Sequence, residues 1–340
     1  MGDPRTVSRG GMTLVELLVV IAILGMLSVV VLPSLSDGIN SRRYREAARN
    51  VSAFIARSQS RAIGAATPRG VLIQPLAADP AAAIDVFFAN TPDVYSGELG
   101  TSTAIIQGVT NVTPGPLAMT FDPMTTAKIA AQPDFLVAGD AIQFGGRGPR
   151  FKLLPPNQLT MWMEDNQSPR NTAWPRATGA GLPFKIYRQP TRAPGGVFQV
   201  QGGASIDLAW SCLGTRPFSN FILPEMTDKS ITILFDASGK PLELVHSGGV
   251  RTTIGEPIFL LIGESDLSGN DYNPAVAGDN TSIQPEKRQG ANWQYGDCVW
   301  LCIDNNSGVV KFGMVAPRAK TVYESQAYVR MTVALGAGER

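Results

Sequence analysis

The chain has 340 residues, 44% of them hydrophobic and 17% charged, which is enough apolar material for a sizeable core in one or two domains. With 29 basic and 28 acidic residues the net charge is +1, so no whole-chain charge excess indicates nucleic-acid binding. The only histidine is His246, which leaves at most one candidate for a histidine-dependent triad or a multi-histidine metal site.

An uncharged run extends from Leu17 to Leu35 and, as a helix, would cover about 28 Å of hydrocarbon, so it is a candidate membrane span. Glu16 stands at its edge. A charged side chain at the centre of a membrane helix costs roughly 2.5 to 3.5 kcal/mol, so this acid needs a reason. Locally, "TLVE" is a capping box in which Thr13 is the N-cap and Glu16 is the third helical residue.

Three processing schemes compete for this segment. A secretory signal peptide has an apolar region of about 7 to 15 residues before its cleavage site, and this run is longer. A plain anchor is also possible, but basic residues flank the run on both sides, so the positive-inside rule does not decide its orientation. In the third scheme, the hydrophilic leader "MGDPRTVSRGG" is cut before the apolar run. The flanking basic residues are Arg5 and Arg9 before the run and Arg42, Arg43 and Arg45 after it.

The stretch "GGMTLVELLVVIAILGML" resembles the cleavage and methylation segment of type IV prepilins and type II secretion pseudopilins. The resemblance implies that a membrane-embedded prepilin peptidase cuts after Gly11 and methylates the new amino terminus at Met12, where phenylalanine is usual. Glu16 matches the near-invariant glutamate of that family, which implies pairing with the amine of a neighbouring subunit in a filament. Pro33 lies where these subunits usually carry a helix-loosening proline.

The expected organisation is a leader over 1–11, a membrane half of the first helix over 12–35, its amphipathic half over 36–66, and a β-rich extracytoplasmic head over 67–340. The amphipathic half carries an apolar stripe that should pack on a sheet. The cluster Arg42, Arg43 and Arg45 could contact acidic lipid headgroups or an acidic face of a neighbouring subunit, or form a solvated helix face. The stripe consists of Ile39, Tyr44, Ala47, Ala48, Val51, Phe54, Ile55, Ser58, Ala62 and Ile63.

The 35 glycines and 25 prolines favour a head of short strands. Breakers at Pro68 and Gly70 predict a first strand from Val71. Turn residues predict hairpins around 236–239 and 304–308, and shorter strands are expected at "DAIQFGG", "LTMWME", "PFKIYR" and "GGVFQVQGGASIDLAW". The final "YVRMTVALGAGER" alternates apolar residues and favours an edge strand, with a short helix as the alternative. The helix, the β head and the late "SG" hairpin resemble the minor pseudopilin H and FimT group, whereas 76–229 has no counterpart there.

Two other features of the head bear on its chemistry. Cys298 and Cys302 lie about 13 Å apart on one expected strand and should not bond each other. Cys212 could pair with either of them, although small buried apolar residues are the favoured interpretation of all three. The loop "GESDLSGNDYNPAVAGDN" carries oxygen ligands suited to calcium, but it fails the EF-hand template, so a solvated loop is the default.

The sequence therefore predicts an α+β fold, with a long N-terminal membrane-spanning helix followed by a β-rich pilin-like head. The expected function is that of a pseudopilin-like filament subunit of a type II secretion system, contributing to protein export, with no catalysis, cofactor or metal. Expected partners are prepilin peptidase, other pseudopilins or pilins, inner-membrane lipid and exported cargo, and no nucleic acid. The subunit would sit in the bacterial inner membrane as a single-pass protein with its head in the periplasm or outside. Alternatives are a minor pilin of a type IV pilus, active in adhesion or DNA uptake, and a pilin-anchored binding or enzymatic head.

Overall fold

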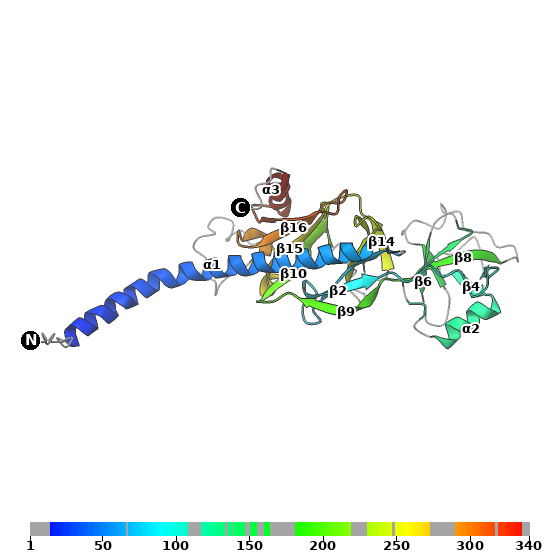
Figure 1. Ribbon diagram of the computed structural model, residues 1–340, viewed down its shortest axis with the longest axis horizontal. Helices are drawn as coiled ribbons and strands as arrows, with labels where there is room; N and C mark the ends of the chain where they lie inside the picture. The colour runs from blue at the N-terminus through cyan, green and yellow to red at the C-terminus, as the bar shows by residue number, and fades with distance from the viewer. Residues whose placement is uncertain are drawn as a thin grey trace, which may run out of the picture.

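The computed structural model shows an α+β protein with one long helix and a β-rich head (Figure 1). It describes residues 14–65, 67–107, 117–132, 135–137, 139–146, 150–154, 160–163, 181–218, 230–246, 249–272, 290–316 and 319–334, and within the first of these ranges the side chains of 27–39 are not described.

Helix α1 (Leu14–Ala62) is continuous over 49 residues. Its first part projects away from the head, and its second part lies along the main sheet (Figure 1). Glu16 in the first turn and Arg61 in the last turn each carry the charge that suits the helix dipole at that end. The backbone stays helical through Pro33. The predicted apolar stripe is confirmed from Tyr44 to Ala62, where its residues are buried. Ile63 follows the helix and is exposed, so its place in the stripe was wrong.

The main sheet has eleven antiparallel strands in the order β14-β13-β12-β1-β2-β10-β15-β16-β17, while β11 pairs with β10 and β9 pairs with β2. The strands are β1 (Arg69–Pro75), β2 (Ala82–Asn90), β9 (Thr191–Gln199), β10 (Ala204–Leu213), β11 (Arg216–Pro217), β12 (Ile231–Phe235), β13 (Pro241–His246), β14 (Val250–Thr253), β15 (Ile258–Glu264), β16 (Val299–Ile303) and β17 (Val310–Met314).

The two predicted hairpins are confirmed as β12–β13 and β16–β17. In each turn an aspartate accepts hydrogen bonds from the residues that follow it. Asp236 Oδ1 accepts from the backbone N–H of Ser238 and Lys240, and Asp304 Oδ2 accepts from the backbone N–H of Ser307. These Asx turns fix the chain reversal locally, which is why the sequence pattern alone located them.

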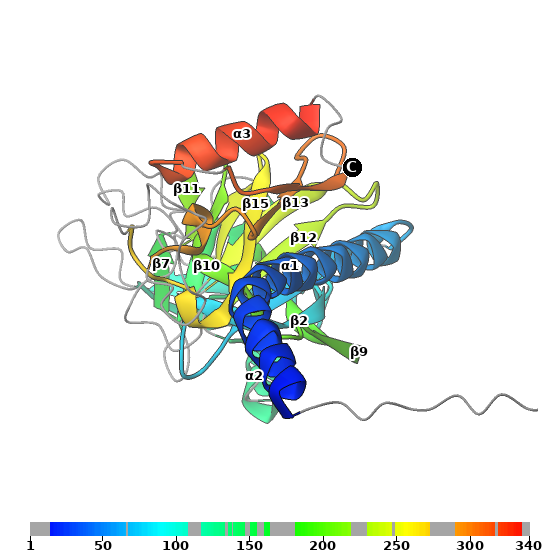
Figure 2. The same cartoon turned by 90° about the vertical axis from the view of Figure 1, so that its left-hand side faces the viewer.

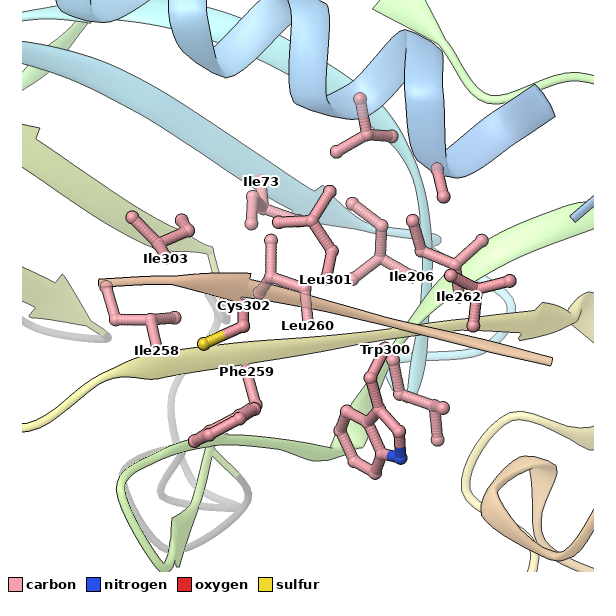
Figure 3. Close-up of a cluster of buried hydrophobic side chains, with 14 of the residues drawn as sticks. Ile73, Ile206, Ile258, Phe259, Leu260, Ile262, Trp300, Leu301, Cys302 and Ile303 are labelled. Carbon is pink, nitrogen blue, oxygen red and sulfur yellow. The ribbon is translucent and has the colours of Figure 1, made fainter. Parts of the chain in front are cut away.

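The main core lies on both faces of the sheet. Strands alternate their side chains between faces, so Leu260 and its partner Leu301 point toward α1, whereas Phe259 and Trp300 point away from it (Figure 3). The opposite face is covered by α3 (Val322–Ala334), where Ser325 Oγ accepts a 2.8 Å hydrogen bond from Trp300 Nε1. Figure 2 shows α1 and α3 on opposite sides of the strands.

The expectation of a C-terminal edge strand was wrong, because these residues form α3. Val322, Ser325, Gln326 and Val329 are all buried, and their spacing is that of one helix face. Met331, which belonged to the alternating pattern, is 63% exposed. The helical alternative is therefore confirmed.

A second body is inserted between β2 and β9. It is a closed barrel with the strand order β3-β4-β7-β6-β5-β8 and a separate apolar core. It lies at the end of the head remote from the start of α1 (Figure 1). The predicted strands in this region are confirmed as β5, β7 and β8. The barrel elements are β3 (Thr103–Gln107), β4 (Leu117–Phe121), α2 (Pro123–Ala131), β5 (Ala141–Phe144), β6 (Phe151–Leu154), β7 (Thr160–Met163) and β8 (Leu182–Tyr187).

A polar network holds the barrel against β13 and β14. Arg251 on β14 donates to Glu243 Oε2 at 2.8 Å and to the backbone carbonyl of Arg188, which follows β8, at 2.8 Å. Asp140 is buried at the barrel side and accepts from the backbone N–H of Gln189 at 2.7 Å. Burial raises the pKa of Asp140 even though backbone hydrogen bonds oppose the shift. The bond from Arg251 to Arg188 joins the main sheet to the segment that leaves the barrel.

Candidate assembly helix

The residues predicted to be processed and to direct assembly belong to the N-terminal segment. Gly11 and Met12 lie outside the described residues, as does Thr13 of the predicted capping box. Glu16 is described and is exposed in the first turn of α1. Pro33 lies within α1, but its side chain is outside the described part. The roles predicted for these four residues and for the capping box therefore stay predictions.

The first part of α1 exposes apolar side chains around its whole circumference. Met26 is 74% exposed and Leu14 is 79% exposed, although both are large and hydrophobic. A helix that is apolar all round is normally buried in a protein core or a membrane. We call this surface the apolar stem. Its exposed large side chains are Leu14, Val15, Leu17, Leu18, Val19, Val20, Ile21, Ile23, Leu24 and Met26.

Among the residues whose side chains are described, no helix holds an apolar stretch long enough to cross a membrane. The predicted span from Leu17 to Leu35 runs into residues 27–39, whose side chains are not described. The span therefore stays a prediction.

The second part of α1 is bound firmly to the head. Tyr44, Val51 and Ile55 are each at most 2% exposed against the sheet. Near the helix end, Gln59 Nε2 donates to the carbonyl oxygens of Gly308 at 2.6 Å and Gly239 at 3.2 Å, which lie in the turns of the two predicted hairpins. The helix is thus fixed to two separate hairpins, and the apolar stem is joined to the head through one continuous helix.

A groove with a volume of 610 Å³ lies beside α1, between the helix and β9. Arg43, Glu46 and Asn50 line it from the helix, and Val197 and Gln199 line it from β9. The side chains are of mixed polarity, and the groove contains none of the predicted site residues.

A buried carboxylate, Asp207 on β10, was not predicted from the sequence. It accepts from the backbone N–H groups of Ala209, Trp210 and Gly269, and from Asn292 Nδ2 at 3.0 Å. Burial raises its pKa to about 7 against these hydrogen bonds. The β10–β15 register shifts between Asp207 and Cys212, so the carboxylate satisfies the amides of an irregular strand. The only signal in the sequence is one acid within the apolar stretch "SIDLAW".

All three cysteines are free and buried, so the favoured interpretation is confirmed. In the strand register, Cys212 on β10 and Cys302 on β16 each lie opposite Phe259 on β15, which runs between them. The two cysteines are therefore two strand spacings apart, beyond the reach of a disulfide. Burial raises the pKa of Cys212 to about 12 and that of Cys302 to about 11, which makes both thiols unreactive.

The loop considered for calcium is described only as far as Tyr272. Its described part includes the 3-10 turn η3 (Ser265–Leu267), and the carbonyl of Asn270 accepts from Trp210 Nε1 at 2.9 Å. Within the described ranges, no group of three or more His, Cys, Asp or Glu side chains could hold a metal ion. The absence of a metal site in the full loop stays a prediction.

Comparison with known proteins identifies the N-terminal segment. Residues 7–32 match the family model described as the prokaryotic N-terminal methylation motif. The matched range contains Gly11, Met12 and Glu16. This prepilin-type motif supports a type IV pilin-like or pseudopilin subunit, and it implies processing by a prepilin peptidase and assembly with other pilins. No curated protein and no solved structure matches the chain significantly.

Proposed function

We propose that this chain is a pseudopilin-like filament subunit of a type II secretion system, which contributes to protein export. In this proposal prepilin peptidase removes residues 1–11 and methylates Met12. Before assembly, the mature subunit resides in the inner membrane as a single-pass protein, with its head in the periplasm or outside. Its action is mechanical and not catalytic, and the head is similar in type to the minor pseudopilin H and FimT group.

The observation that carries this proposal is the apolar stem next to the methylation motif. Burying one Val, Leu, Ile or Met side chain is worth roughly 1.5 to 3 kcal/mol, so a stem of ten such residues demands an apolar environment. Lipid supplies that environment before assembly, and the stems of neighbouring subunits supply it in a filament. The continuous helix then transmits force from the filament axis to the head.

Glu16 gives the stem its register in the filament. It is the only acid in the first turn of α1 and lies beside a run without charge. Cleavage after Gly11 creates a positive amine at Met12. In an apolar filament core, the pairing of one subunit's carboxylate with a neighbour's amine removes much of the burial cost of both charges.

The alternative is a minor pilin of a type IV pilus, active in adhesion or DNA uptake. The observation that favours it is the barrel, a second body with its own core at the end of the head remote from the stem (Figure 1). A filament subunit that displays such a body could carry a binding module, and a pilin-anchored binding or enzymatic head is the extreme form of this alternative. The net charge of +1 argues against DNA as the ligand.

Deletion of the gene in its own host separates the two functions. The proposal expects that specific proteins disappear from the culture medium while surface pili, adhesion and DNA uptake are retained. A copy carrying Glu46→Ala, which removes an exposed acid further along the same helix, should restore export, whereas Glu16→Ala should not. Normal export together with lost pili, adhesion or DNA uptake would replace the proposal with the alternative.

A further inference from the structure

Three exposed arginines lie close together on α1, shortly after the apolar run ends. They are Arg42, Arg43 and Arg45, and we call them the arginine collar. We propose that the collar binds the headgroups of anionic phospholipids on the side of the membrane that holds the head. This inference rests on the proposed function, because it requires the apolar stem to lie in a membrane.

The collar arginines have local contacts but no acidic partner in the described structure. Arg43 Nη1 donates to Asn40 Oδ1 at 3.2 Å, and Arg45 Nε donates to the backbone carbonyl of Ser41 at 3.0 Å. None of the salt bridges between described residues includes a collar residue. Each guanidinium carries a permanent positive charge and retains free donors that fit phosphate oxygens.

The position of the collar along α1 matches the headgroup layer. At 1.5 Å per residue, Arg42 lies about 10 Å and Arg45 about 15 Å beyond Leu35, the last residue of the uncharged run. The headgroup region adds roughly 5 to 8 Å to each side of the hydrocarbon. Helical side chains point back toward the N-terminus, and long arginine side chains extend toward the interface. The collar guanidinium groups can therefore reach the phosphates.

The charge balance of the helix selects an anionic surface. Between 36 and 62 the only acids are Asp37 and Glu46, against six arginines. Basic residues near an anionic membrane each contribute about 1 kcal/mol, and the attraction decays within a Debye length of about 8 Å. Arg57 is about 33 Å beyond Leu35 and is out of range. Arg61 is engaged by the head, because its guanidinium lies 4.2 Å from the ring centroid of Phe88.

Arg43 also connects the collar with the head. Its guanidinium lies over the turn at Gly202 and Gly203 between β9 and β10, where an added Cβ on Gly203 would meet Arg43 Nη2 at 3.0 Å. Lipid binding at the collar would therefore bring this turn toward the membrane surface. Before assembly, these contacts would hold the head at a fixed distance from the membrane surface.

The test uses the full chain reconstituted in lipid bilayers with spin-labelled phosphatidylglycerol or phosphatidylcholine as the probe. Electron paramagnetic resonance measures how much of each lipid is immobilised next to the protein. We expect phosphatidylglycerol to be preferred by about fivefold for each engaged arginine at low salt. The preference should fall toward one in 0.3 M salt. The triple change Arg42→Gln, Arg43→Gln and Arg45→Gln should reduce the preference to what Arg5 and Arg9 contribute at the other end of the run, and Arg57→Gln should leave it unchanged.

The outcomes separate this inference from the proposed function. If neither lipid is immobilised, the stem does not enter the membrane, and both the proposed function and the collar's lipid contact fail. If both lipids are immobilised equally by the wild-type chain, the stem is inserted but the collar does not recognise anionic headgroups. A preference that the triple change does not diminish would likewise overturn the assignment to the collar.

Discussion

Gln59 Nε2 donates a 2.6 Å hydrogen bond to the backbone carbonyl oxygen of Gly308, 249 positions along the chain. The same nitrogen donates at 3.2 Å to the carbonyl oxygen of Gly239. One side chain near the end of α1 therefore joins the turns of the β12–β13 and β16–β17 hairpins. The orientation of the apolar stem relative to the head depends on this contact as well as on the packing of the helix on the sheet.

Gln59→Ala should destabilise the folded head by about 1 to 3 kcal/mol, because two carbonyls lose their donor at a half-buried site. Urea unfolding of the full chain in detergent measures the loss. Ser60→Ala is the matched control, since Ser60 Oγ bonds only to the carbonyl of Ala56 in the same helix, and it should change stability by less than about 0.5 kcal/mol. Equal effects of the two changes would show that the hydrogen bonds from Gln59 to the two hairpin turns do not stabilise the head.

Gly308→Ala should be more costly than an ordinary glycine substitution. Gly308 has φ +72°, and an added Cβ would lie 2.5 Å from the carbonyl oxygen of Gly239. Gly145 has φ +61° with open space around it, so Gly145→Ala bears only the backbone cost of about 1 kcal/mol. The melting temperature of Gly308→Ala should be well below that of Gly145→Ala. The reverse order would contradict the close approach of the turns that contain Gly308 and Gly239.

Asp207 should make the head less stable as the pH rises from about 4 to 7. Burial raises its folded-state pKa to about 7, above the unfolded value of 3.8, so in this window the folded state binds the extra proton. The free energy of unfolding should fall by up to about 1.4 kcal/mol per pH unit from this group.

Asp207→Asn should remove the contribution of Asp207 to the pH dependence of the free energy of unfolding. Asp304→Asn is the control, because a hydrogen bond from Ser307 lowers the pKa of Asp304, and the carboxyl is ionised in both states between pH 5 and 7. Unfolding curves at several pH values measure both variants. A wild-type slope in the Asp207→Asn protein would show that another group is responsible.

Glu16→Ala should leave cleavage of the leader largely intact and impair incorporation into the filament. The peptidase acts at Gly11, whereas the carboxylate is needed only when a neighbour's amine must be neutralised. Glu16→Asp, which keeps the charge, should retain part of the incorporation. Immunoblots of cell and sheared-filament fractions measure both steps. Normal amounts of the Glu16→Ala protein in filaments would remove the proposed salt bridge.

Local signals in the sequence were sufficient for several parts of this fold. The turn aspartates Asp236 and Asp304 located both hairpins, because their side chains bond the amides that follow them. The stripe from Tyr44 to Ala62 identified the buried face of α1, since a helix on a sheet needs one apolar face. Glu16 was singled out as a candidate because a charge beside an uncharged run is costly without a partner, and it matches the glutamate of the methylation motif.

Features that depend on distant contacts could not be predicted in this way. The barrel closes through the pairing of β3 with β8, for example Thr103 with Pro183, and no local pattern encodes that partnership. The alternation at Val329 and Met331 favoured a strand, but the sheet face formed by Phe259 and Trp300 required a helical cover. The role of Asp207 depends on amides contributed by the separate segments at Gly269 and Asn292.

The central claim, that the functional chain begins at Met12 and assembles through the apolar stem, is tested most directly by mass spectrometry of the mature N-terminus. Protein isolated from its own host should begin with N-methylated Met12, with residues 1–11 absent. An intact Met1, or a chain that begins at Asp37 after the apolar run, would contradict the claim.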